Sequence, residues 1–368
     1  MSGIAFDRVT KRYGRTIALD DVSFECREGE FFTLFGPSGA GKTTTLELIA
    51  GIKGDYEGSI LMGGRPIEGV AIQERNVAMA FEHYALYPHM TVGQNIAFPL
   101  RSPRAPKRNE AEIAARVQKA ADDLGIGHLL DRSPVQLSGG QKQRVSLARA
   151  LVREPAAYLL DEPIAHLDAK LRTVARANLK EMANRLGTTI LYVTHDYREA
   201  LGLSDRVMVL RAGRIEQIGT PREIYDAPAT DYVAHLVGDP IMNLIDGVIQ
   251  EEGGRLVFRG DGIQVSPPAQ AEGRIRQLLQ GGSNEIRLGI RPSDVAVDVG
   301  DQSRADVVLP LYAMEHTAHH MIANFELGEN IVAAKVAPIE GLSIGQRLGL
   351  SFDMAQAHYF RKTFETTR

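Results

Sequence analysis

One segment of eight residues constrains the fold of this chain more than any other. It follows the apolar run Phe31–Phe35, precedes the helical run Thr43–Ala50, and reads Gly36-Pro37-Ser38-Gly39-Ala40-Gly41-Lys42-Thr43. This is a full match to the pattern G-x-x-x-x-G-K-[ST], whose glycines let backbone N–H groups turn inward around phosphate oxygens. The helix after the loop would point its positive end at the same anion. The segment therefore predicts a phosphate-binding loop between a strand and a helix.

The surrounding pattern predicts an α/β fold built on a mostly parallel sheet. Three runs, Phe31–Phe35, Tyr158–Leu160 and Thr189–Val193, are almost continuously apolar, which is typical of strands buried on both faces. Between about residues 85 and 155 the periodicity becomes helical, with apolar positions at three- and four-residue spacing in Glu110–Leu124 and Gln143–Leu151. We expect an inserted helical subdomain there.

A second domain is expected after about residue 236. The chain has 368 residues, which favours two domains over one compact core. From residue 237 onward the pattern changes to short alternating runs separated by Gly and Pro, such as Arg255–Phe258 and Ile263–Val265. We therefore expect one domain over residues 1–236 and a small all-β domain over residues 237–368.

Composition excludes several classes of protein. Lys+Arg 42 against Asp+Glu 46 gives a net charge of −4, which disfavours a surface that follows a nucleic-acid backbone. We find no run of about 18 apolar residues that could span a membrane and no signal-peptide pattern at Met1–Asp7. The single cysteine, Cys26, cannot form an internal disulfide and fits a reducing cytoplasm.

Two acidic residues follow the second buried strand. Asp161, at the end of a strand beside a phosphate loop, is placed to hold Mg²⁺, as is the hydroxyl of Thr43. Glu162 is then the candidate general base that orients the attacking water. The alternative interpretation is that both acids only cap a helix before Pro163.

A second candidate anion site is the run Ser138-Gly139-Gly140-Gln141, which leads directly into a helix. Free N–H groups and the helix dipole can bind phosphate at such a start. Because the chain has two such helix starts but one lysine loop, we expect each nucleotide to lie between the lysine loop of one subunit and the Ser-Gly-Gly end of another. An ordinary loop cap is the alternative.

In motif order the chain resembles an ATP-binding cassette (ABC) subunit of a bacterial importer over essentially its whole length. The resemblance implies ATP and Mg²⁺ as cofactors, with Thr44 joining Gly36–Thr43 in the Walker A loop. It makes Ser138–Gln141 the signature motif, and Asp161 and Glu162 the Walker B pair. It implies that Ala165-His166-Leu167-Asp168 is the D-loop. It also implies that Tyr13 is the aromatic residue that stacks on adenine and that His195 is the switch histidine.

Further segments resemble ATPases of sugar importers. The run Glu82–Val92 is similar to their Q-loop, which implies that Tyr84–Pro88 docks on two integral membrane permease subunits. Gly238–Leu244 and Leu288–Val295 resemble the oligonucleotide-binding-like (OB-like) regulatory domain of ATPases that serve maltose, glycerol phosphate and polyol importers. The implied fold is a P-loop ABC ATPase domain with a helical insertion, followed by that domain.

The chain departs from the family pattern at two positions. The Q-loop position usually holds Gln, but here Glu82 adds a negative charge near the γ-phosphate, as a candidate catalytic residue and Mg²⁺ ligand. Ala165 stands where the family often has Ser. One hypothesis is that the subunit belongs to an unequal ATPase pair. A tolerated substitution is the alternative, since a carboxylate can also bind Mg²⁺.

The resemblance implies a peripheral ATPase on the cytoplasmic face of the inner membrane. It would form a homodimer or unequal heterodimer, energise uptake of a sugar or polyol, and depend indirectly on an extracytoplasmic solute-binding protein. An inorganic-ion or polyamine importer is the first rival, and a soluble cassette protein acting on DNA or ribosomes the second. His316, His319 and His320 lack further ligands at convincing spacing, which disfavours a metal site there.

Overall fold

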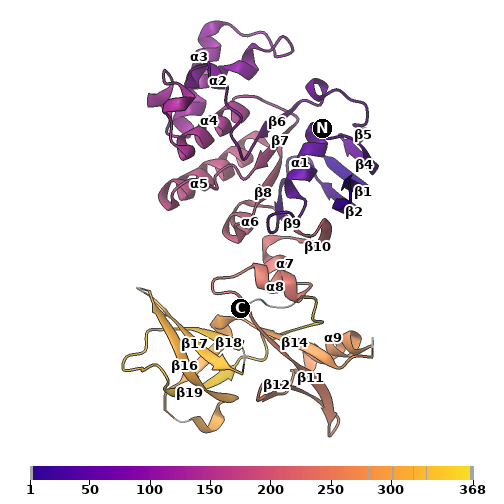
Figure 1. Ribbon diagram of the computed structural model, residues 1–368, viewed down its shortest axis with the longest axis vertical. Helices are drawn as coiled ribbons and strands as arrows, with labels where there is room; N and C mark the ends of the chain where they lie inside the picture. Colours follow the sequence, from indigo (N-terminus) through magenta and orange to yellow (C-terminus); the bar gives the residue numbers. More distant parts are fainter. Residues whose placement is uncertain (1–2, 281, 301, 318, 329, 365–368) are drawn as a thin grey trace. The chain divides into compact units, whose positions relative to one another are not determined.

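The computed structural model describes all residues except 1–2, 281, 301, 318, 329 and 365–368. The described chain forms two compact units, residues 1–222 and 223–368 (Figure 1). No described helix is long and apolar enough to cross a membrane.

The first unit contains two sheets. A six-stranded sheet has the order β10-β9-β3-β8-β7-β6, in which only β10 is antiparallel to its neighbour. Its strands are β3 (Phe31–Phe35), β6 (Val77–Ala80), β7 (Ala157–Asp161), β8 (Thr189–Thr194), β9 (Arg206–Arg211) and β10 (Arg214–Gly219). A four-stranded antiparallel sheet has the order β2-β1-β4-β5. It consists of β1 (Ile4–Tyr13), β2 (Thr16–Cys26), β4 (Tyr56–Met62) and β5 (Arg65–Pro66).

Helices cover this unit, and three of them form the insertion between β6 and β7. The helices are α1 (Lys42–Ala50), α2 (Val92–Ala97), α3 (Glu110–Asp123), α4 (Gly139–Leu151), α5 (Ala169–Leu186) and α6 (Tyr197–Leu203). In Figure 1 the insertion is the magenta group of α2, α3 and α4. Each of these three begins with a capping box, formed by Thr91 and Gln94, by Asn109 and Glu112, and by Ser138 and Gln141.

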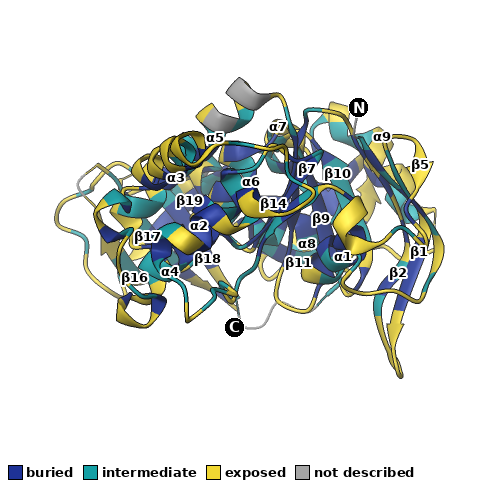
Figure 2. Cartoon of the chain, turned by 90° about the horizontal axis from the view of Figure 1, so that it is seen from above, coloured by how far each residue is buried: buried dark blue, intermediate teal, exposed yellow. Residues whose placement is uncertain are grey.

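The central sheet is buried on both faces: every residue of β3, β7 and β8 is buried, and most of their side chains are apolar. Successive side chains point to opposite faces. Tyr158 of β7 therefore joins a core shared with the helical insertion, while Leu159 joins a core between the two sheets and α1. Figure 2 shows β7 and β9 as buried, whereas α3 and α5 present exposed residues.

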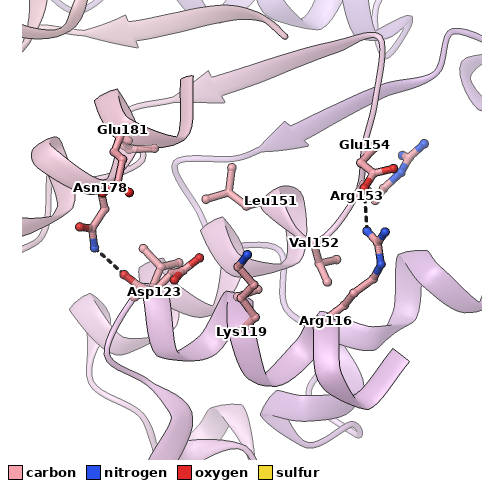
Figure 3. A pocket seen from close by; sticks show the side chains of 12 residues that line it. Arg116, Lys119, Asp123, Leu151, Val152, Arg153, Glu154, Asn178 and Glu181 are labelled. Carbon is pink, nitrogen blue, oxygen red and sulfur yellow. Dashed lines mark hydrogen bonds and ion pairs between the residues drawn. The ribbon is translucent and has the colours of Figure 1, made fainter. Parts of the chain in front are cut away.

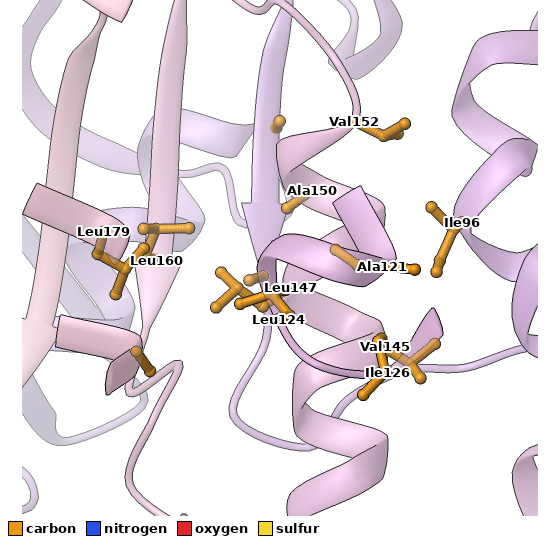
Figure 4. Close-up of a cluster of buried hydrophobic side chains, with 14 of the residues drawn as sticks. Ile96, Ala121, Leu124, Ile126, Val145, Leu147, Ala150, Val152, Leu160 and Leu179 are labelled. Carbon is orange, nitrogen blue, oxygen red and sulfur yellow. The ribbon is translucent and has the colours of Figure 1, made fainter. Parts of the chain in front are cut away.

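The helical insertion packs around α4. Ala121 of α3 and Leu124, which follows that helix, pack in one apolar cluster with Val145 and Leu147 of α4 and Leu160 of β7 (Figure 4). All five side chains are at most 7% exposed. The insertion is thus joined to the sheet by a continuous apolar core.

The second unit contains two five-stranded sheets around one core. The first sheet, in the order β13-β12-β11-β14-β20, contains β11 (Asn243–Glu252), β12 (Arg255–Gly260), β13 (Ile263–Val265), β14 (Glu285–Ile290) and β20 (His358–Phe360). The second, in the order β15-β19-β16-β17-β18, contains β15 (Val295–Asp298), β16 (Val307–His316), β17 (Met321–Leu327), β18 (Asn330–Val336) and β19 (Arg347–Phe352). The short alternating runs in the sequence did not predict α9 (Ala269–Leu279), which also lies here.

Two short helices lie near the start of the second unit, α7 (Pro221–Asp226) and α8 (Asp231–Leu236). The sequence-based division places residues 223–236 in the first domain, whereas in the structure they belong to the second unit. The physical reason is an ion pair of 2.9 Å between Asp231 of α8 and Arg287 of β14, whose side chains are 0% and 1% exposed. Such a buried pair ties α8 to the C-terminal sheet.

Candidate active site

The phosphate loop connects β3 to α1 in a conformation that requires glycine at two positions. Gly36 has φ 154° and Gly41 has φ 105°. A Cβ atom at Gly36 would lie 2.4 Å from the carbonyl oxygen of Leu210, and one at Gly41 would lie 2.6 Å from that of Ala18. Neither position can therefore accept a side chain without a shift of backbone.

Within the loop, Lys42 is buried while Pro37, Ser38 and Gly39 form an exposed rim. Lys42 Nζ donates to the carbonyl oxygens of Gly36 at 2.8 Å and Pro37 at 2.9 Å. Burial lowers the pKa of this ammonium group, and nearby carboxylates oppose that effect. Unlike α2, α3 and α4, helix α1 begins without a side-chain cap, at Gly41. The N–H groups of its first turn therefore receive no bond from a side chain of the N-cap residue, which is a glycine.

The structure brings Asp161, at the end of β7, to the start of α1. The Thr43 hydroxyl donates to Asp161 Oδ1 at 3.2 Å. The pKa of Asp161 is raised to about 6, chiefly by burial. The bond from Thr43 and the charge of Lys42 oppose the rise, while the carboxylates of Glu82 and Glu162 add to it. Glu82, in the turn after β6, thus lies close enough to act electrostatically on Asp161.

Glu162 and His195 form a direct pair. Asp161 of β7 is in register with Val193 of the parallel strand β8, so the two residues that follow these strands lie at the same sheet edge. His195 Nδ1 lies 2.9 Å from Glu162 Oε2, with side chains 57% and 13% exposed. Glu162 has φ 45°, in the left-handed region that residues with side chains rarely adopt.

The sequence analysis did not identify Gln143, whose side chain binds the backbone of Glu162. Gln143 Nε2 donates to the carbonyl oxygen of Glu162 at 2.8 Å, and its Oε1 accepts from the backbone N–H of His166 at 3.0 Å. The side chain is 2% exposed. The available signal was a polar residue four positions before Leu147, on the apolar face of the predicted helix.

The run Ser138–Gln141 starts α4 beside the D-loop. Ser138 Oγ accepts from the N–H of Gln141 at 3.3 Å, and Gln141 Oε1 accepts from the N–H of Ser138 at 2.9 Å. A Cβ atom at Gly140 would lie 3.3 Å from the carbonyl oxygen of His166. Among the described residues, no hydrogen bond joins this run to the loop at residues 36–43.

Two aromatic features lie outside this cluster. Tyr13, at the end of β1, is 40% exposed, with the ammonium groups of Lys11 and Lys53 at 5.0 and 6.0 Å from its ring centre. In the segment Tyr84–Pro88, Tyr87 packs on the ring of Phe98 at 4.7 Å. Its backbone N–H donates to Asn95, a buried residue, at 2.8 Å.

A cavity of about 260 Å³ lies elsewhere, between α3, the end of α4 and α5 (Figure 3). Its rim carries an ion pair of 2.9 Å between Arg116 and Glu154, and Asn178 Nδ2 donates to the carbonyl oxygen of Asp123 at 2.5 Å. None of the sequence-predicted site residues lines it. The cavity is therefore separate from the phosphate loop.

Comparison with known proteins agrees with this geometry. Residues 19–165 match the family described as ABC transporter, and residues 238–295 match the MalK OB fold domain. The sn-glycerol-3-phosphate import ATP-binding protein of Rhizobium meliloti is 42% identical, covering 98% of each chain. The trehalose/maltose import ATP-binding protein of Thermococcus litoralis is 39% identical, over 99% of this chain and 98% of its own.

A solved structure shows the same cassette fold. A dimeric ATP-binding cassette in a post-hydrolysis state, bound to ADP and phosphate, is 29% identical with a TM-score of 0.56. The likeness covers 60% of this chain and 99% of that one. The expected fold class, an ABC ATPase domain followed by an OB-like domain, is confirmed. The chain belongs to the ATP-binding cassette (ABC) transporter family and has the organisation of that family's import ATPase subunits.

Proposed function

We propose that this chain is the ATP-hydrolysing subunit of an ABC importer that takes up a sugar, a polyol or a related carbohydrate. The observation that carries the proposal is identity of about 40% along the whole chain with import ATP-binding proteins. Those relatives are named for sn-glycerol-3-phosphate, for trehalose and maltose, and for xylose and arabinose.

ATP would occupy the site built around β3 and α1. The triphosphate would lie against the backbone N–H groups of residues 36–44, with Lys42 on the outer phosphates and the adenine on the exposed ring of Tyr13. The hydroxyl of Thr43 and the carboxylates of Asp161 and Glu82 form an all-oxygen donor set of the kind Mg²⁺ prefers. When bound there, Mg²⁺ would neutralise charge on the phosphates.

Hydrolysis would depend on the pair Glu162 and His195. The Glu162 carboxylate would accept a proton from water as that water attacks the γ-phosphorus and the bond to the β-phosphate oxygen breaks, releasing ADP. His195 would donate to the γ-phosphoryl oxygens, where negative charge gathers. Gln143 would keep Glu162 in place through its bond to the Glu162 carbonyl oxygen.

Two copies or two related subunits would be needed for each complete site. The loop at residues 36–43 and the run Ser138–Gln141 would face each other across the dimer, as the positive ends of two helices. The dimeric state of the solved cassette supports this arrangement. The subunit would lie on the cytoplasmic face of the membrane, with Tyr84–Pro88 against the permeases and the solute-binding protein on the other side.

Co-expression with candidate permease genes from the same genome tests the proposal. We expect the chain to co-purify with the permeases from detergent-solubilised membranes, and their presence to raise its ATPase activity. Uptake of labelled sugars, polyols and glycerol phosphate should then require the chain. Uptake of an inorganic ion or a polyamine instead would favour the first rival, and co-purification with nucleic acid would contradict the proposal.

A further inference from the structure

The expected permease-docking segment has an unusual backbone conformation. Two successive residues in it, Tyr84 with φ 62° and Ala85 with φ 46°, are left-handed although neither is glycine. Residues with side chains rarely adopt this conformation, and two in a row need support from their surroundings.

Arg149 of α4 supplies that support. Its guanidinium group donates through Nη2 to the carbonyl oxygen of Tyr84 at 3.0 Å and through Nη1 to that of Ala85 at 2.8 Å. The same group lies 5.5 Å from the centre of the Tyr87 ring. One side chain thus contacts three of the five residues of Tyr84–Pro88, with a planar, two-pronged geometry that lysine cannot reproduce.

Tyr84 lies near the other end of α4, the end at which that helix begins. Its ring meets the ring of His166 edge-on, with centroids 5.9 Å apart. Its hydroxyl lies 3.5 Å from where a Cβ atom on Gly139 would be. The segment therefore contacts α4 near both ends of that helix, at Arg149 and beside the run Ser138–Gln141.

We propose that Arg149 is a positioning residue that makes segment 84–88 and helix α4 move as one body. It is 11 positions from Ser138, or about 16 Å along a helix. The apolar packing of α4 in Figure 4 makes that helix a stiff connection. A displacement of the docking segment would then reach the phosphate-binding end of α4 directly. The inference rests on the proposed function, which gives these two ends their partners.

Hydrogen exchange of backbone amides tests the proposal in the full chain. The parent carries Glu162→Gln, so that bound ATP persists, and exchange is measured with and without ATP and Mg²⁺. The amides of Tyr84 and Ala85 are suitable probes because they donate to Phe81 and His83 at 3.1 and 2.7 Å. We expect ATP to slow exchange at residues 36–43, 138–141 and 84–87.

The test variant is Arg149→Lys and the matched control is Arg153→Lys. Arg153 is also half-buried and donates to a backbone carbonyl, that of Val77 at 3.1 Å, but it does not contact the docking segment. In the test variant we expect ATP to slow exchange at residues 138–141 as before, while residues 84–87 exchange about tenfold faster than in the parent with ATP. The control should match the parent at both places.

The outcomes separate the two proposals. Equal protection of residues 84–87 in the Arg149→Lys variant and the parent overturns the positioning role, and so does a parent whose residues 84–87 do not respond to ATP. A parent without protection at residues 36–43 contradicts the proposed function itself. If the lysine variant does not fold, Tyr87→Leu keeps both hydrogen bonds of Arg149, removes the contact of its guanidinium group with the ring together with the ring packing on Phe98, and should speed exchange at residues 84–87 about twofold.

Discussion

Replacing Gln143 by Met should destabilise the first unit strongly while hardly changing side-chain volume. In the structure this buried side chain holds two backbone groups, the carbonyl of Glu162 and the N–H of His166. Methionine fills the same space but makes neither bond. The N–H of His166 would then lose its partner, and the carbonyl oxygen of Glu162, the residue that we propose as the general base, would keep only the bond from the N–H of Ala165.

The expected magnitude follows from those two bonds. The His166 N–H loses its partner, whereas the Glu162 carbonyl oxygen still accepts from the N–H of Ala165 at 3.3 Å. We therefore expect the unfolding free energy to fall by about 1–3 kcal/mol, the cost of one donor left without a partner. That is a large share of the roughly 5–15 kcal/mol that stabilises a typical domain. The control is Gln141→Met, because Gln141 lies on the same helix and loses only the solvent-exposed bond from Ser138. Its cost should stay below about 1 kcal/mol.

Urea unfolding followed by far-ultraviolet circular dichroism measures both variants, since the chain has no Trp for fluorescence. The ATPase rate of the Gln143→Met variant should also fall at temperatures where the variant is still folded, because Glu162 loses its backbone support. Equal unfolding free energies for the two variants would refute the reasoning.

Three further predictions concern other sites. The pKa of Asp161 is raised from 3.8 to about 6 in the folded chain, so the effect of this carboxyl group on stability is most favourable near pH 4 and is lost as pH rises through 6. Asp161→Asn should therefore raise the Tm of the nucleotide-free chain at neutral pH and leave the Tm unchanged near pH 4. Asp231→Asn removes one of the two carboxylates that pair with Arg287, while Asp246 remains, and it should lower the unfolding free energy of the second unit by about 1–3 kcal/mol in urea titrations. If this chain belongs to an unequal pair, Glu82→Gln should raise the ATPase rate of the purified homodimer about fivefold, equivalent to roughly 1 kcal/mol; equal rates would count against the unequal pair.

The parts of the site that depend on local sequence pattern could be predicted from the sequence. The strand, glycine loop and helix around Lys42 could be predicted because burial, turn geometry and the helix dipole all act within a few residues. The same holds for Ser138, whose side chain caps the helix that follows it. The proximity of Glu162 and His195, by contrast, depends on β7 and β8 being parallel neighbours in the sheet, an arrangement that the local pattern did not predict.

Long-range polar contacts could not be predicted in this way. Gln143 and Arg149 lie on a helix whose apolar spacing was clear, but their partners are backbone groups far away in the sequence. The spacing of apolar residues along a helix does not show which backbone group a polar side chain on that helix will bind. The membership of α8 in the second unit was missed for the same reason, because it depends on the pairing of Asp231 with Arg287.

The central claim is that Glu162 activates water at a site that binds ATP independently of it. The most direct test compares ATP binding and turnover in the parent and in Glu162→Gln, which removes the proton acceptor and keeps the shape of the side chain. We predict unchanged ATP affinity and turnover slower by about 10²- to 10⁴-fold. Hydrolysis at the parent rate in the Glu162→Gln variant would contradict the account.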